Sequence, residues 1–302
     1  MTYLPTFAKF VRTDWARDHP GDCDTARQWA VYNDRVYREV QDVLQDPFIV
    51  AQRGQGIVAE ELAKGILEAV FDAAWVEEKF PLADERDPAN PRWIVKAYRR
   101  RELARRVYEF QSHPWFQDFV TYTRTNEVTS ALFEADVLHT LMRMPGTVTR
   151  GTTTGSRGED FDVHLELGTA GQVPIEVKCK QDGTPYSTAT IRNTVKTAIK
   201  QLPKGHTGWL FLQLPASWVG PRLEEEYAQT LHDAIRQTSR IGAVLTAIDK
   251  PHLDVDRGTF RLNRDWHLLG HPDVPDPLWK AALLLKQLLD GDMDHFAPHA
   301  PF

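Results

Sequence analysis

Apolar and polar residues alternate along two neighbouring segments near the middle of the chain. In residues 159–167 every second residue from Phe161 to Leu167 is apolar, and residues 174–180 repeat the same alternation. A period of two predicts half-buried β-strands, and the glycine-containing residues 168–171 between them predict a turn. We therefore expect a β-hairpin that carries Asp162, Glu176 and Lys178 on one polar face.

The residues around this hairpin predict further helices and strands. Apolar positions recur at helical spacing before and after it, and a short fully apolar run favours a buried strand. The expected order is a helix over 125–143 with Asn126 as N-cap, the hairpin, a helix over 188–202, a strand over 209–214, a helix over 223–240 and a strand over 241–248. Strands mixed with helices in this way predict an α/β fold with a mixed central sheet flanked by helices.

The remaining parts of the chain differ from this central region. Residues 1–125 are predicted to be mostly helical, with long amphipathic stretches over 25–44, 56–79 and 91–111 and a polar, proline-bounded linker over 81–91. Residues 251–302 predict a single helix, over 278–289. The expected organisation is a helical N-terminal region over 1–125, an α/β core over 126–250 and a C-terminal extension over 251–302.

Three carboxylates and one lysine are the candidate chemical groups. Two neighbouring carboxylates such as Asp162 and Glu176 can hold Mg²⁺ or Mn²⁺ through oxygen and leave positions for water and a phosphate. A lysine beside them can position that water or neutralise a phosphoryl group. Glu134 is a carboxylate on an apolar helical face, which is costly unless the group is paired or binds metal. Its neighbours three and four residues away are small or apolar: Ser130, Ala131, Val137 and Leu138.

Asp162 followed by Glu176-Val177-Lys178 resembles the signature of the PD-(D/E)XK nuclease superfamily. The resemblance implies a restriction-endonuclease-like core over 126–250 and a Mg²⁺-dependent nuclease that hydrolyses phosphodiester bonds. The tendency of the family implies DNA as the substrate. One departure from the family pattern is Phe161, which stands where proline is common.

The same resemblance implies individual roles. Asp162, Glu176 and the main-chain carbonyl of Val177 would bind the metal, and Lys178 would position the attacking water. Glu134 matches the family's helical carboxylate and would support a second ion or its water shell. Asp160 shares a face with Asp162 and stays open as the alternative ligand.

Charge is distributed unevenly along the chain. The whole chain carries a net charge of -6, yet residues 143–204 contain nine basic and six acidic side chains, a local charge of +3. A local basic surface is what nucleic-acid binding requires. The candidate substrate contacts are Arg157, Lys180, Arg192, Lys196 and Lys200. The arginine-rich stretch 91–111 could either grip phosphates or pair with acidic helices of its own region.

Composition restricts the remaining classes of function. An apolar content of 42% and a charged content of 26% are ordinary for a globular protein. No apolar run of eighteen residues suggests a membrane span, no secretory signal is apparent, and two distant cysteines give neither a disulfide framework nor a zinc set. We expect a cytoplasmic protein. The alternative function is a catalytically inactive module that binds nucleic acid or protein; a homodimer would suit double-strand cutting, but no pattern specifies one.

Overall fold

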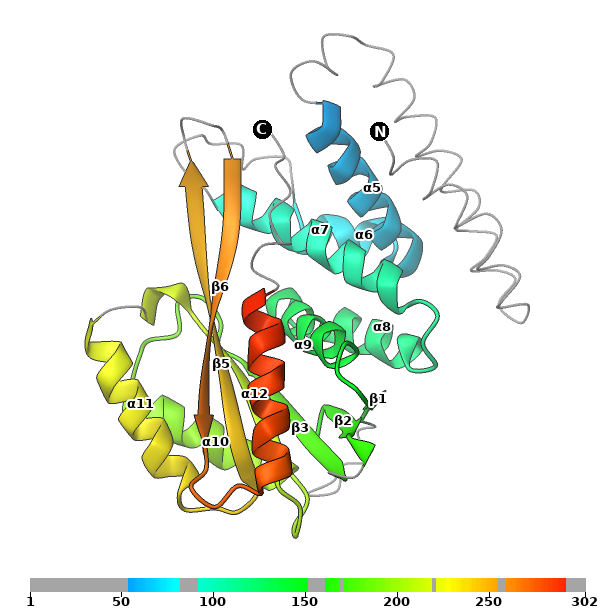
Figure 1. Cartoon of the computed structure of the whole chain (residues 1–302). Coiled ribbons are helices and arrows are strands. Elements are labelled where there is room, and N and C mark those ends of the chain that lie inside the picture. Colours follow the sequence, from blue (N-terminus) through cyan, green and yellow to red (C-terminus); the bar gives the residue numbers. More distant parts are fainter. Residues whose placement is uncertain are drawn as a thin grey trace. The chain divides into compact units, whose positions relative to one another are not determined.

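A computed structural model describes residues 54–81, 92–151, 161–168, 171–218, 221–254 and 259–291. The chain divides into two compact units, one formed mainly by residues up to Val128 and one mainly by residues from Thr129 onward (Figure 1). The helix predicted over 25–44 lies outside the described residues. Among the helices that are described, none combines the length and the apolar character that crossing a membrane requires.

The described residues of the first unit up to Val128 are mostly helical. They contain α5 (Gly54–Phe71), α6 (Ala73–Lys79), α7 (Arg92–Phe110) and α8 (Phe116–Thr125). The single helix predicted over 56–79 breaks at Asp72, whose φ of 72° is outside the helical range. The Asp72 carboxylate accepts a hydrogen bond from the Trp75 N–H at 2.9 Å and so caps α6. The break was not predicted because no glycine or proline marks it.

Asn126 caps a different helix from the one predicted. It is the C-cap of α8, a helix that the sequence pattern did not reveal, and not the N-cap of the helix that follows. Its main-chain N–H and its side-chain amide both donate to the carbonyl oxygen of Tyr122. These two bonds satisfy a helix-end carbonyl and explain why α8 ends there.

The arginine-rich helix α7 does not present an open basic face. Arg100 and Arg106 are 3% and 0% exposed. Arg106 donates to Glu109 at 2.7 Å, and the more exposed Arg105 donates to the same carboxylate at 2.9 Å. The structure therefore favours the alternative in which these arginines pair within the fold, and the helix is not retained as a nucleic-acid contact.

The second unit is built on a six-stranded sheet in the order β1-β2-β3-β4-β5-β6. The strands are β1 (Thr147–Arg150), β2 (Val163–Glu166), β3 (Gln172–Cys179), β4 (Gly208–Leu214), β5 (Ile241–Asp254) and β6 (Thr259–Gly270). Pairing is antiparallel from β1 to β3 and parallel from β3 to β5, and β5 and β6 run in opposite directions (Figure 1). The predicted α/β class with a mixed sheet is confirmed, whereas β1 and β6 were not predicted.

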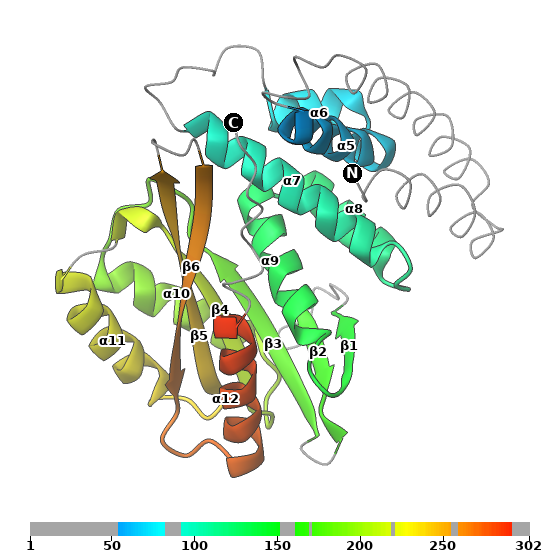
Figure 2. The ribbon, with the colours of Figure 1, turned by 45° about the horizontal axis from the view of Figure 1, so that its top comes forward.

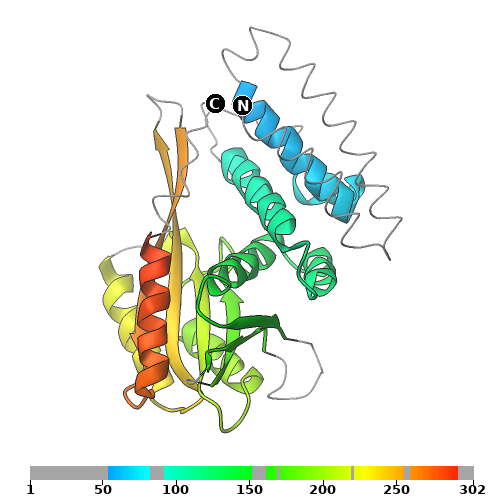
Figure 3. The same ribbon diagram turned by 45° about the vertical axis from the view of Figure 1, so that its right-hand side comes forward.

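Four long helices accompany this sheet. They are α9 (Val128–Leu141), α10 (Thr188–Gln201), α11 (Pro221–Ile235) and α12 (Asp276–Gly291). All four were predicted, although α11 ends earlier than residue 240. Ser187 starts α10 by accepting a hydrogen bond from the Thr190 N–H at 3.0 Å. The long strands β5 and β6 run beside α12 (Figure 3), so the C-terminal part of the chain contributes a strand and a helix to the second unit.

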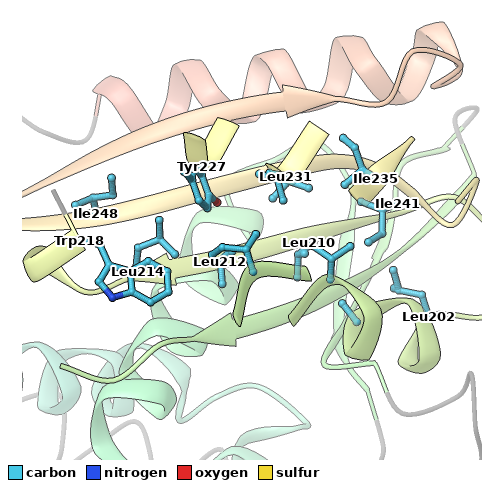
Figure 4. Packing of buried hydrophobic residues seen from close by; sticks show 14 residues of the cluster. Leu202, Leu210, Leu212, Leu214, Trp218, Tyr227, Leu231, Ile235, Ile241 and Ile248 are labelled. Atoms are coloured by element: carbon cyan, nitrogen blue, oxygen red, sulfur yellow. The ribbon is translucent and has the colours of Figure 1, made fainter. Parts of the chain in front are cut away.

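Helices pack on both faces of the sheet. Helices α10 and α11 lie on one side of it (Figure 2), and their apolar residues pack with Leu210, Leu212 and Leu214 of β4 (Figure 4). Phe133 of α9 stacks on Trp266 of β6, which also meets Phe211 of β4 edge-on, each at 6.1 Å between ring centres. Phe211 alternates with the leucines of β4, so α9 packs on the opposite face.

Candidate metal centre

Asp162 is fixed where strand β2 separates from β3. The last paired residues are Val163 and Ile175. Beyond them the Asp162 N–H donates to the Ile175 carbonyl at 3.1 Å, and the Asp162 carboxylate accepts the Val177 N–H at 2.7 Å. The Asp162 carboxylate thus takes the place of a main-chain acceptor for the Val177 N–H, and it points at the middle of β3.

The backbone on the other side of Asp162 is equally constrained. Its carbonyl accepts the Gly151 N–H at 2.9 Å. A Cβ atom at Gly151 would lie 2.0 Å from the Phe161 carbonyl oxygen. Only glycine therefore allows the backbone at residue 151 to approach the backbone at residue 161 this closely. Asp162 is therefore held between the end of β1 and the middle of β3.

Glu176 is a residue of β3, lies beside Asp162 and is completely buried. It is level with Leu210 on β4, so it belongs to the face of the sheet that α10 and α11 cover. Its Oε1 forms an ion pair with the Nζ of Lys178. Its Oε2 is buried and has no hydrogen-bond donor among the described residues. A buried carboxylate oxygen without a donor is unfavourable unless a cation or a proton joins it.

The electrostatics of the pair agree with this geometry. Burial, together with the neighbouring Asp162 carboxylate, raises the pKa of Glu176 to about 9, although Lys178 opposes the shift. Burial also raises the pKa of Asp162, against the lowering effect of Lys178 and of the Val177 N–H. Two adjacent carboxyl groups cannot both be ionised in a buried site unless positive charge is added. The hairpin prediction that brought Asp162, Glu176 and Lys178 together agrees with this placement.

Glu134 is engaged elsewhere. It lies on α9 and is 1% exposed. Its Oε1 accepts a hydrogen bond from the Nε of Arg150 at 2.9 Å and lies 2.7 Å from the Nη2 of the same guanidinium. Within the part of the chain that the structure describes, no group of three or more acidic, histidine or cysteine side chains could hold a metal ion. The predicted role of Glu134, support of a second ion or its water shell, stays a prediction, and in this structure Arg150 is a partner of its carboxylate.

The other predicted contacts fall in several places. Val177 uses its N–H to hold Asp162, and Lys180 is half-buried one step beyond Lys178 on the same face. Arg192, Lys196 and Lys200 are exposed on α10. Arg157 and the alternative ligand Asp160 lie outside the described residues.

Arg150 was not identified from the sequence. It lies on β1, a strand of four residues that is too short for its alternation to stand out. The signal that could have found it is the pairing requirement of Glu134, because a carboxylate on an apolar helical face needs a cation nearby.

The donor set fits one divalent cation of the hard type. Two carboxylates, one of them with an oxygen that lacks a donor, supply the oxygen ligands that Mg²⁺ and Mn²⁺ prefer. Comparison of the chain with protein-family models, with curated proteins and with solved structures gave no match. The assignment of function therefore rests on the residues of this chain.

Proposed function

We propose that this protein is a metal-dependent nuclease that hydrolyses phosphodiester bonds, with DNA as its substrate and a restriction-endonuclease-like core. The observation that carries the proposal is the adjacent pair of the half-buried Asp162 and the completely buried Glu176, with Lys178 against Glu176. A mixed sheet with parallel strands β3 and β4 and helices on both faces supports the core assignment. Cytoplasmic location and a homodimer belong to the same proposal.

The roles of the side chains follow from their positions. Asp162, held by the Val177 N–H, and Glu176 would bind Mg²⁺ or Mn²⁺, with the Val177 carbonyl as an additional oxygen ligand. The bound ion would supply a Lewis acid and an acidified water. Lys178 is 24% exposed at its side chain and pairs with Glu176, so it can reach both the site and a solvent-side phosphate. Its ammonium group would position the water and balance charge on the phosphoryl group.

One observation favours the alternative function. Among the described residues no third acidic side chain joins Asp162 and Glu176 in a group that could hold a metal ion, and Glu134 pairs with Arg150. An inactive module that binds nucleic acid or protein would retain the sheet without needing a complete metal site. A two-carboxylate site with a lysine can nevertheless bind one ion, so the enzyme remains the better-supported function.

The proposal is tested by cleavage of plasmid, linear and single-stranded DNA and of RNA. We expect cleavage in the presence of Mg²⁺ or Mn²⁺ and none in EDTA. We also expect Mn²⁺ to raise the melting temperature of the protein, because an ion that binds only the folded state stabilises it. If neither cleavage nor a thermal shift occurs with any of these substrates and ions, the nuclease is ruled out and the binding module is favoured.

The exposed basic face of α10 gives a further prediction. Arg192, Lys196 and Lys200 recur every four residues, opposite the buried Ile191 and Val195. The double variant Lys196→Glu/Lys200→Glu should bind DNA about tenfold more weakly, and its log–log salt dependence should fall by about 2 if both lysines contact phosphates. Binding is measured by fluorescence anisotropy in Ca²⁺ at several salt concentrations.

The matched control for this double variant is Lys280→Glu on α12. Like the two α10 lysines, Lys280 is exposed, with 75% of its side chain accessible, but it lies on a different helix. Equal weakening by Lys280→Glu would show that the effect comes from overall charge and would remove α10 from the proposed interface.

A further inference from the structure

The candidate metal centre lies where one face of the sheet changes from covered to open. Over β4 this face is buried under α10 and α11. Over β1 and β2 the same face reaches solvent, since Thr149 is exposed and His164 is half-buried. Val163 and Leu165 point to the opposite face and are completely buried. The open part of the face therefore presents polar side chains beside the carboxylates.

The strand register places two of these side chains next to Asp162. His164 follows Asp162 by two residues, so both side chains lie on one face of the sheet, about 6.8 Å apart along the strand. Thr149 is the antiparallel partner of His164, which puts the two Cβ atoms about 5 Å apart on that face. Because β2 and β3 are antiparallel, His164 lies on one side of the Asp162 and Glu176 pair and Lys178 lies on the other.

The His164 ring is held in place while its polar atoms stay available. The ring meets Phe161 edge-on, with 5.6 Å between the ring centres, and Phe161 packs against the core under α10 and α11. Among the described residues, neither the imidazole of His164 nor the hydroxyl of Thr149 has a hydrogen-bond partner. Each of these groups can donate a hydrogen bond. Two such donors side by side on an open face suit the oxygen atoms of a phosphate.

We propose that Thr149 and His164 form a phosphate subsite, which holds the DNA phosphate next to the one at the metal ion. The inference rests on the proposed nuclease function and adds substrate contacts to it. His164 is not a metal ligand in this assignment, because no group of three histidine, acidic or cysteine side chains among the described residues could hold a metal ion.

The spacing of these groups agrees with a nucleic-acid backbone. A phosphate that is cleaved must lie at the ion held by Asp162 and Glu176, and its two neighbours along the DNA strand lie on either side. Successive phosphates are separated by a distance comparable to the two-residue step from Asp162 to His164. One neighbour thus lies toward Lys178 and the other lies over Thr149 and His164. Contacts of this kind fix the position of the backbone and read no base, so the subsite favours no sequence.

The subsite is tested by removing its donors while keeping its shape. His164→Phe retains a ring against Phe161 and loses both nitrogens, and Thr149→Val retains the branched side chain and loses the hydroxyl. We expect the double variant to bind a short fluorescein-labelled DNA duplex about tenfold more weakly in Ca²⁺, as measured by fluorescence anisotropy. The KM for cleavage in Mg²⁺ should rise by a similar factor, with kcat within about twofold of wild type. Binding as tight as that of wild type would overturn the inference.

Thr147→Val is the matched control for Thr149→Val. Thr147 is exposed on the same strand and the same face, but it is level with Glu166, one step further from the metal centre. Thr149→Val alone should weaken DNA binding by about threefold, whereas Thr147→Val should bind and cleave DNA as wild type does. Equal weakening by both valine variants would remove Thr149 from the subsite.

Metal binding is measured in parallel, by isothermal calorimetry with Mn²⁺. We expect His164→Phe to bind Mn²⁺ as tightly as wild type, because the ring belongs to the phosphate subsite and not to the ligand set. Loss of Mn²⁺ binding in this variant would make His164 a metal ligand and would contradict the assignment.

A scan of the substrate locates the phosphate that is held. Each phosphate near the cleavage site is replaced in turn by a neutral methylphosphonate, and DNA binding in Ca²⁺ is measured. In wild type, replacement of a phosphate next to the metal-bound one should weaken binding. In the double variant the same replacement should have little effect, because the protein partners of that phosphate are gone. If wild type and double variant respond alike, other residues hold this phosphate and the subsite is ruled out.

The outcomes also separate this inference from the proposed function. If wild type cleaves DNA and the double variant binds and cleaves equally well, the subsite is overturned while the nuclease stands. If wild type binds DNA without cleaving it, and only the double variant binds more weakly, the nuclease is overturned while the subsite stands. If wild type neither binds nor cleaves DNA, both are overturned.

Discussion

Replacing Glu176 by glutamine should abolish cleavage and at the same time stabilise the metal-free protein. The variant retains the size of the side chain but removes a metal ligand, and we expect a loss of cleavage of about 10³-fold or more, which corresponds to ~4 kcal/mol of transition-state stabilisation. Stability should change in the opposite direction. Glu176 is completely buried beside Asp162, and its Oε2 lacks a donor among the described residues.

The stabilising part of this prediction follows from the raised pKa of Glu176. At neutral pH its carboxyl group stays protonated in the folded metal-free protein and ionises in the unfolded chain, which favours unfolding. A glutamine amide can also donate to the Asp162 carboxylate, and it has no proton to lose on unfolding. We expect the metal-free variant to gain about 1–3 kcal/mol of unfolding free energy. Chemical denaturation in EDTA measures this gain. Mn²⁺ should then raise the melting temperature of wild type and leave that of the variant unchanged.

Glu166→Gln is the control for Glu176→Gln. Glu166 lies on the adjacent strand β2, and its side chain is exposed. The same chemical change there should alter neither cleavage nor stability by a measurable amount. If Glu176→Gln destabilises the metal-free protein as a cavity or a lost ion pair would, Lys178 contributes more than the acid pair costs, and the two carboxylates are not a site kept for a cation.

The fold was predictable where periodicity is long and was missed where it is short. The fourteen-residue helix α10 and the fully buried strand β4 repeat their patterns over enough residues to be recognised. Strand β1, with four residues, is too short for its alternation to be distinguished from chance. Strand β6 was missed for another reason: charged residues such as Arg264 and Asp265 interrupt its apolar pattern, and they are stabilised by ion pairs that only the folded chain creates.

The candidate site was predictable in part, for a related reason. Asp162 directly precedes β2, and Glu176 and Lys178 lie on β3, which pairs with β2, so their proximity follows from alternation and pairing. The partner of Glu134 depends on where β1 lies in the sheet, and local sequence does not specify this. Arg150 is sixteen residues from Glu134 along the chain, and the sequence therefore indicated that Glu134 needs a cation without indicating which one.

Arg264 provides the second large effect, on stability. Its guanidinium donates to Asp136 of α9 at 2.7 Å and to Asp249 of β5 at 2.6 Å. Gln213 of β4 donates to the same Asp249 at 2.6 Å, and the Cys179 thiol of β3 contacts Gln213 at 3.0 Å. The side chains of the arginine and the two aspartates are between 13% and 18% exposed. This network ties β6 and α9 to the end of the strand that carries Lys178.

Arg264→Met should therefore destabilise the protein by about 3–5 kcal/mol, because it leaves two largely buried carboxylates without their cation. Urea denaturation followed by circular dichroism measures the loss. Lys250→Met is the control, since Lys250 pairs with Asp265 at the surface, where its side chain is 46% exposed, and such a pair contributes less than about 1 kcal/mol. Adding Asp136→Asn and Asp249→Asn to Arg264→Met should restore part of the stability. The guanidinium of Arg264 also packs on Phe133 and Trp266, 5.5 and 5.9 Å from their ring centres. If the two asparagine substitutions restore no stability, the loss comes from this packing and not from uncompensated charge.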